Sequence, residues 1–314
     1  MGRIASALVV MLLVSILTFL VLDLIPGNAA IVAVGVEGSA ETLARLEAGL
    51  GLDRSLPQRI ADYYRGLVSL DLGTSSYYAQ DVWSLIRQRL GVTIPLALLS
   101  TAISFSCALV LGSLAAYRRG GLLDGICRTI VQLAGSIPSF WLSLLLLILF
   151  SSVFSVAGIG DYVPPSVSIR GYVTAVFLPV IVLAVGQLGP MLRLVRSSMI
   201  TSLGEDWYAS ARVKGLGRGR LIFVYALRHA ISGPLTLCGN QLAKLLGGTA
   251  IVESIFSLPG LGRLFLTAVE MRDLQLVQGI VIFITALVVL MNLVFDILVH
   301  LVNPAADSRK AGGT

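Results

Sequence analysis

The sequence predicts an all-α polytopic membrane protein with six transmembrane helices in a single domain over residues 1–314. Two observations of composition point to a bilayer: the mean hydropathy is +0.89, and only 13% of the residues are charged, against about a quarter in a typical soluble domain. The third observation is that uncharged segments long enough to cross a bilayer recur along the whole chain.

The first predicted span covers residues 4–25. Nineteen residues, Ile4 to Leu22, carry no charge, and at about 1.5 Å per residue they make roughly 28 Å of helix, close to the hydrocarbon thickness. A cleaved signal peptide is the alternative interpretation. Its apolar region is usually only about 7–15 residues long, and no small-x-small cleavage site precedes Pro26. An uncleaved helix is therefore expected.

Five further apolar segments predict spans at 92–117, 129–156, 173–194, 230–256 and 278–302. Pro138 is expected to kink the third span of the chain, 129–156. With six spans both termini lie on one side of the membrane. The predicted inner segments hold thirteen Lys and Arg residues and the outer ones nine, of which six fall in the long 26–91 segment, where the positive-inside rule weakens. Both termini and the loop 195–229 are therefore predicted to be cytoplasmic, and 26–91 extracytoplasmic.

The net charge of +6 indicates attraction to anionic lipid of the inner leaflet. Nucleic-acid binding would need a basic face on a soluble fold, and the sequence offers none. We therefore expect membrane lipid, and no nucleic acid, as a partner.

Catalytic motifs are weak or missing. Lys214, Lys244 and Lys310 all lack a preceding glycine, so the chain has no P-loop and any ATP chemistry must come from a partner. The short "GIGD" ending at Asp161 matches a pattern of intramembrane aspartyl proteases, but no second motif places another carboxylate beside it. His229 and His300 are too far apart in sequence to suggest a metal site. We expect a non-catalytic subunit without a cofactor or metal of its own.

The loop sequence "EDWYASARVKGL", Glu205 to Leu216, interrupts this apolar pattern. Ser202 is predicted as an N-cap with Glu205 completing a capping box, and Gly215 as a left-handed C-terminal stop. The helix would carry Trp207, Ala211 and Lys214 on one side. Such a helix can lie on the membrane surface as an anchor for the loop, or it can bind in a groove on a partner protein.

Together with "YALRHA" (225–230), this loop resembles the EAA loop of inner-membrane permeases in binding-protein-dependent ABC importers, of the dipeptide, oligopeptide and nickel group. Pro234 comes one position late, His229 replaces the family's usual asparagine, and Asn28-Ala29 replaces Asp-Pro. Other motifs resemble the family in its order: "LIPGN" (24–28), "LGLDRSLPQRIADYYRGLVSLDLGTS" (50–75), "YRRG" (117–120), "SIPSFWLSLLL" (136–146), "VESIFSLPGLGRL" (252–264) and "RDLQLVQG" (272–279).

The resemblance implies a type I ABC importer permease in a bacterial-type inner membrane. Its partners would be a second permease, two cytoplasmic ATPases that bind ATP and Mg²⁺, and an extracytoplasmic substrate-binding protein. The cargo would be a di- or oligopeptide, with nickel or a metal chelate as an alternative. The coupling helix that docks on an ATPase would comprise Glu205, Asp206, Trp207, Tyr208, Ala211, Arg212, Lys214 and Gly215.

Gln241 and Lys244 lie in the fifth predicted span, where a charge costs roughly 3 kcal/mol. Two roles are possible for these residues: a polar contact between spans, or a position on the translocation path. A stand-alone channel or secondary transporter is the alternative of another class, although no inverted repeat is evident and intramembrane carboxylates are scarce.

Overall fold

The computed structural model describes residues 2–24, 41, 54–69, 71–152 and 162–302. This part of the chain is almost wholly helical and contains no β-strand beyond one isolated bridge, Thr74 with Asp81. The predicted all-α character is thus confirmed. The "GIGD" segment and most of 26–53 lie outside the described residues. The chain divides into two compact units, Met1–Thr93 with Pro259–Val289 (unit 1) and Ile94–Leu258 with Leu290–Thr314 (unit 2).

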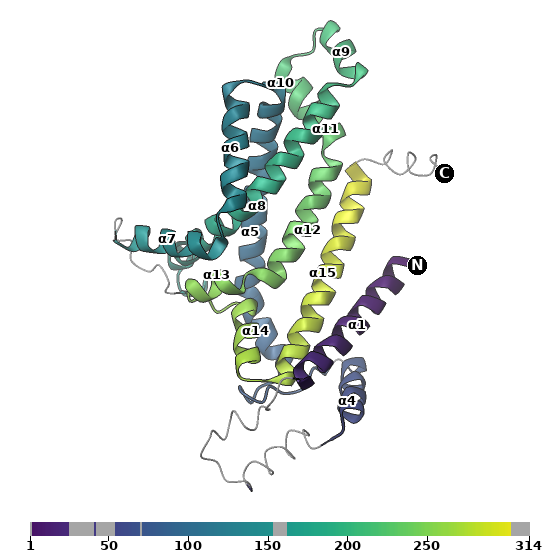
Figure 1. The fold of residues 1–314 in the computed structure, drawn as a ribbon, viewed down its shortest axis with the longest axis vertical. Coiled ribbons are helices and arrows are strands. Elements are labelled where there is room, and N and C mark those ends of the chain that lie inside the picture. Colours follow the sequence, from purple (N-terminus) through teal and green to yellow (C-terminus); the bar gives the residue numbers. More distant parts are fainter. Residues whose placement is uncertain (1, 25–40, 42–53, 70, 153–161, 303–314) are drawn as a thin grey trace. The chain divides into compact units, whose positions relative to one another are not determined.

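In the part of the chain that the structure describes, membrane-spanning length is reached by three single helices, α5 (Val82–Tyr117), α8 (Ile169–Leu203) and α15 (Leu274–Val302) (Figure 1). Two bent helix pairs bring the candidate spans to five. In addition α1 (Gly2–Leu24) contains a shorter apolar stretch, Val9–Val21. The count of six spans and their orientation stay predictions.

Helix α5 begins ten residues before the predicted span. Its first turns, "VWSLIRQRL", mix charged and apolar residues, so hydropathy alone misses them. The Asp81 carboxylate accepts a hydrogen bond from the Ser84 backbone N–H at 2.7 Å and thereby supports the start of the helix. α5 and α15 both contribute residues to each unit.

The third predicted span is not one straight helix. α6 (Leu122–Ser136) and α7 (Ser139–Ser152) meet at a bend of 100°, and Pro138, which disfavours a helical conformation in the residue before it, lies at the break. The predicted kink is therefore confirmed. A second bend, of 65°, separates the Arg218–Ala230 segment from α12 (Ser232–Gly248), which is followed by α13 (Ala250–Ile255).

Unit 1 has its core where α5 meets α14 (Leu261–Glu270) and the start of α15. Ile86, Leu261 and Ile280 are fully buried there. A Cβ added to Gly279 would come within 2.5 Å of Val82, so glycine permits this close packing. α4 (Leu56–Val68) contacts α1 through a Ser15–Tyr64 hydroxyl hydrogen bond of 2.8 Å.

Unit 2 is centred on α8, whose residues Met191, Leu192 and Val195 are fully buried. Figure 1 shows α6 running alongside α8, and the two helices pack closely. Gly112 of α5 allows a similar approach, because a Cβ there would lie 2.8 Å from Val195. The loop segment after α8 forms α9 (Asp206–Val213), α10 (Arg218–Arg220), a π-helix η1 (Leu221–Ala226) and α11 (Leu227–Ala230).

Candidate functional site

The predicted loop helix is present as α9, but it begins later than the capping pattern indicated. Glu205 is its N-cap. Ser202 belongs to the last turn of α8, is 3% exposed, and donates its hydroxyl to the Ala226 carbonyl at 3.1 Å. The predicted Ser202 N-cap is therefore wrong: α8 continues its buried face to Leu203, and the serine hydroxyl is used between α8 and η1 instead.

The end of α9 agrees with the prediction. Gly215 has a φ of +78°, and the helix closes with the hydrogen-bond pair of a Schellman motif. Leu216 N–H donates to the Ala211 carbonyl at 3.4 Å, and Gly215 N–H donates to the Arg212 carbonyl at 3.0 Å. A Cβ at position 215 would meet nothing within 4 Å. The glycine is therefore required for its backbone conformation and not for space.

Trp207 holds α9 against its own chain. The indole stacks on the His229 imidazole, with ring centroids 5.0 Å apart and planes 15° apart, and it packs against the core of unit 2. Its Nε1–H donates to the Glu205 carboxylate at 3.0 Å. His229 is in turn held by a 2.9 Å contact between Nδ1 and the Tyr225 carbonyl. The sequence analysis noted His229 only as a departure from the family pattern and did not pair it with Trp207, although an aromatic ring at the end of the loop was a usable signal.

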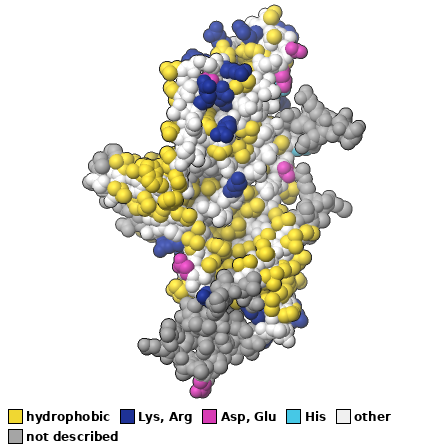
Figure 2. All heavy atoms as spheres, viewed as in Figure 1, with side chains coloured by type: hydrophobic (Ala, Val, Ile, Leu, Met, Phe, Trp, Pro, Cys, Tyr) yellow, Lys and Arg dark blue, Asp and Glu magenta, His cyan; other side chains and the backbone are white. Residues whose placement is uncertain are grey.

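The other predicted site residues of α9 differ in exposure. Tyr208 and Ala211 are half-buried, with Tyr208 edge-on to Trp207 at 5.9 Å. Glu205, Asp206, Arg212, Lys214 and Gly215 are exposed. Val213 is 89% exposed, which the sequence did not single out. The outward surface of α9 therefore combines charged groups with the large apolar side chain of Val213. Figure 2 shows Lys and Arg side chains gathered at this end of unit 2.

A buried ion pair fixes the helices beside this loop. Asp124 in the first turn of α6 is 1% exposed and accepts from Arg196 Nη2 of α8 at 2.9 Å, with a second contact to Nε. It also accepts from the Gly120 N–H at 3.0 Å, where φ is +80°, and lies 3.5 Å from Arg128. The "YRRG" turn is thereby attached to α8, and each charge is compensated.

Two other motifs meet in unit 1. Asp273, fully buried, accepts from the Ser75 hydroxyl at 2.5 Å and from the Tyr77 N–H at 3.1 Å. The Gln275 side-chain oxygen accepts from the Thr74 N–H at 2.9 Å. The "LDLGTS" and "RDLQLVQG" motifs are therefore joined by hydrogen bonds across almost 200 residues of chain, and the 73–81 loop is held in one conformation.

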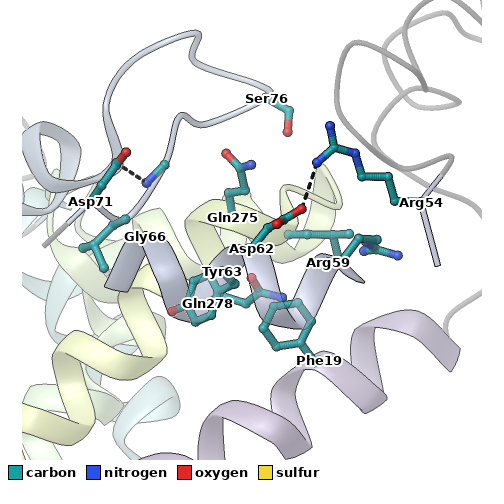
Figure 3. A pocket seen from close by; sticks show the side chains of 13 residues that line it. Phe19, Arg54, Arg59, Asp62, Tyr63, Gly66, Asp71, Ser76, Gln275 and Gln278 are labelled. Carbon is teal, nitrogen blue, oxygen red and sulfur yellow. Dashed lines mark hydrogen bonds and ion pairs between the residues drawn. The ribbon is translucent and has the colours of Figure 1, made fainter. Parts of the chain in front are cut away.

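A cavity of about 240 Å³, lined by polar and apolar side chains, lies beside this loop (Figure 3). Its Tyr63 hydroxyl is buried and has no hydrogen-bond partner among the described residues. Burial raises the pKa of Tyr63 above its usual value, and the neighbouring Tyr64 adds to this. Side chains of both charges line the cavity, namely Arg54, Arg59, Asp62 and Asp71, together with Gln275 and Gln278.

The two candidate path residues lie on α12, apart in sequence from the α9 residues. Lys244 is exposed and Gln241 is half-buried. Within the described part of the chain neither side chain makes a hydrogen bond or an ion pair. Among the described residues no group of three or more His, Cys, Asp or Glu side chains is placed to hold a metal ion.

Long apolar helices, with a polar helix in the loop between two of them, indicate an integral membrane protein. Residues 108–308 match the family of binding-protein-dependent transport system inner membrane components, and residues 1–97 match the N-terminal domain of such components. The chain belongs to this family, as its resemblance predicted.

Two relatives match almost end to end. One is a Brucella abortus protein named for a peptide transport system permease, 39% identical over 302 residues, which are 96% of each chain. The other is the dipeptide transport system permease protein of Escherichia coli, 33% identical over 321 residues and 95% of each chain. Among solved structures, the fold is similar to that of a chain of the MetNI methionine ABC transporter in an inward-facing conformation. The superposition has a TM-score of 0.56 and 18% sequence identity, and it covers 70% of this chain and 97% of the MetNI chain. The fold is thus that of an ABC importer permease.

Proposed function

We propose that this permease moves dipeptides or oligopeptides into the cell across a bacterial inner membrane. The observation that carries the proposal is the match over 95% or more of both chains to relatives named for peptide and dipeptide transport. A nickel or metal-chelate cargo is the alternative that the sequence left open. Among the described residues no cluster of metal-binding side chains supports it. The family match also speaks against a stand-alone channel or secondary transporter.

The coupling residues are proposed to act through α9. Glu205, Asp206, Arg212 and Lys214 would contact a cytoplasmic ATPase together with Val213, because these are the charged and large apolar side chains exposed in and beside α9. Trp207, Tyr208 and Ala211 face inward, and Gly215 ends the helix. Their proposed role is to hold α9 firmly to unit 2, so that movement of the ATPase is passed to the helices behind it.

The work would come from ATP and Mg²⁺ bound by two partner ATPases. Nucleotide binding would favour one arrangement of the spans over another, which is a rigid-body switch driven by differential affinity. A second permease would complete the path, and an extracytoplasmic binding protein would deliver the peptide. Gln241 and Lys244 are proposed to line the path, since both lie on α12 without partners in the described part of the chain.

The orientation completes the proposal. Both termini and the loop 195–229 would be cytoplasmic, and the segment 26–91 extracytoplasmic. The basic side chains around α9 support this orientation through the positive-inside rule.

The test is uptake by the assembled complex in proteoliposomes, produced together with the proteins encoded beside it. Labelled dialanine and labelled nickel are offered in parallel with and without ATP. We expect ATP-dependent dialanine uptake that requires the binding protein. Nickel uptake without dialanine uptake would show that the cargo is nickel or a metal chelate and not a peptide. Uptake of either compound without the ATPase subunits would contradict the importer mechanism.

A further inference from the structure

The exposed face of α12 differs chemically from what lipid requires. Six residues of this helix are exposed, and they recur at spacings of three or four, so they form one face. None of them has a large apolar side chain. They are Gly233, Thr236, Asn240, Lys244, Gly247 and Gly248. The opposite face carries buried residues such as Cys238, Leu242 and Leu246.

Helix α7 of unit 2 shows the pattern that lipid favours, because it exposes Phe140, Trp141, Leu144 and Ile148. The second half of α15 is mixed: it exposes Leu290, Leu293, Val294, Ile297 and Leu298 together with the polar Asn292, Asp296 and His300. α12 is comparable in length with α7, but it exposes the ammonium of Lys244, the amide of Asn240 and the hydroxyl of Thr236 instead. Because a charge in hydrocarbon is expensive, this face must contact water or polar groups in the assembled transporter.

Lys244 has unused hydrogen-bonding capacity. Its ammonium carries three donors and makes no hydrogen bond or ion pair within the described part of the chain. Asn240 lies one turn before it, and Gly247 and Gly248 lie one turn after it. A Cβ at Gly248 would meet nothing within 4 Å, so the surroundings of the ammonium are open. An anionic oxygen is the acceptor that such a donor binds most strongly.

We propose that Lys244 binds the carboxylate of the peptide cargo within the translocation path, with Asn240 as a neighbouring polar contact. This inference rests on the proposed function as a peptide importer and adds the group of the cargo that the permease itself recognises. The exposed glycines leave room beside the ammonium for a ligand or for a closely packed helix of the second permease. An acidic residue of the second permease is the rival partner for the ammonium, and the experiment separates the two.

The first experiment compares uptake by reconstituted complexes containing Lys244→Met, which keeps the side-chain length without the charge, and Lys244→Arg, which keeps the charge. Arg170→Gln, at an exposed arginine near the start of α8, is the matched neutralisation control. For dialanine we expect about a tenfold loss with Lys244→Met, little change with Lys244→Arg or the control, and binding-protein-stimulated ATP hydrolysis retained. Equal uptake by Lys244→Met would overturn the proposal. Loss of the second permease from the complex with Lys244→Met, but not with Lys244→Arg, would assign the lysine to the subunit contact instead.

A second measurement does not depend on the cargo. Asn240→Cys is introduced into the assembled complex after the native residues Cys107, Cys127 and Cys238 are replaced by serine. Its reaction rates with an anionic and a cationic methanethiosulfonate reagent are then compared. Since residues one turn apart lie about 6 Å from each other, removal of the lysine charge should lower the anion-to-cation rate ratio about tenfold.

These outcomes distinguish the two claims. If wild-type complex takes up no dialanine while the reagent ratio falls with Lys244→Met, the cargo assignment fails and the anion-binding face stands. An unchanged ratio, or a cysteine at 240 that reacts with neither reagent, would overturn the anion site whatever the cargo is.

Discussion

The Trp207 indole lies nearly parallel to the His229 imidazole, at a centroid distance of 5.0 Å. Because Trp207 is on α9 and His229 on α11, the stack joins the proposed coupling helix to the segment that leads into α12. A displacement of α9 would therefore reach α12 through packed rings as well as through the backbone.

Removal of this stack should weaken coupling without removing α9. An aromatic contact of this kind contributes about 1–2 kcal/mol with its buried area, so Trp207→Ala and His229→Ala should each lower binding-protein-stimulated ATP hydrolysis about tenfold in complexes of normal composition. Trp207→Ala and the double variant should give similar losses, because either removes the same contact. Additive losses would show that the two residues act separately.

Gly215→Val should disturb the end of α9 through backbone conformation alone. The φ of +78° is unfavourable for a β-branched residue, whereas space is not limiting. We expect normal membrane levels with loss of stimulated hydrolysis and uptake, and Gly215→Asn should retain more activity because asparagine tolerates this region. Gly125→Val in α6 is the control, because a Cβ there also meets nothing within 4 Å and φ is not positive. Equal losses at both positions would contradict the conformational explanation.

Asp124→Asn should destabilise the packing of α6 on α8. It leaves the Arg196 guanidinium without its anionic partner in a largely buried setting, and breaking one side of such a pair costs about 3–5 kcal/mol. Thermal denaturation in detergent should show a lower midpoint. The double variant Asp124→Asn with Arg196→Met should recover part of the loss, and failure to recover any would contradict pairing as the cause.

Asp273→Ala should release the 73–81 loop of unit 1. The Ser75 hydroxyl and the Tyr77 N–H would lose their acceptor, at about 1–3 kcal/mol for each group left unsatisfied. Limited proteolysis should then cut the loop faster than in the wild-type chain. Asp71→Ala provides a comparison, since its carboxylate accepts only from the nearby Gly73 N–H among the described residues. Equal cleavage of both variants would contradict a special role for Asp273.

Hydropathy predicted the membrane class, the ordered motifs predicted the family, and the apolar pattern located the apolar part of the long helices. It did not find the start of α5, because an amphipathic helical segment has no high mean hydropathy. Pro138 indicated a kink, but the 100° angle depends on packing against neighbouring helices. The capping pattern at Ser202 failed because tertiary contact with Ala226 uses the same hydroxyl.

The pairings that shape the candidate site lie beyond local sequence rules. Asp124 and Arg196 are 72 residues apart, and Ser75 and Asp273 are 198 apart, so no spacing argument joins them. Gly215 was predictable because a left-handed stop after a helix is local. The exposure of Val213 required knowledge of which side of α9 packs inward.

The most direct test of the central claim is photo-crosslinking from position 213 in the assembled complex. Val213 is replaced by benzoylphenylalanine, and Leu290, exposed on α15, carries the same group as a control. If α9 docks on the ATPase, position 213 will crosslink to the ATPase subunit and position 290 will not. Complexes that hydrolyse ATP normally but give no ATPase crosslink from 213 would contradict α9 as the coupling helix.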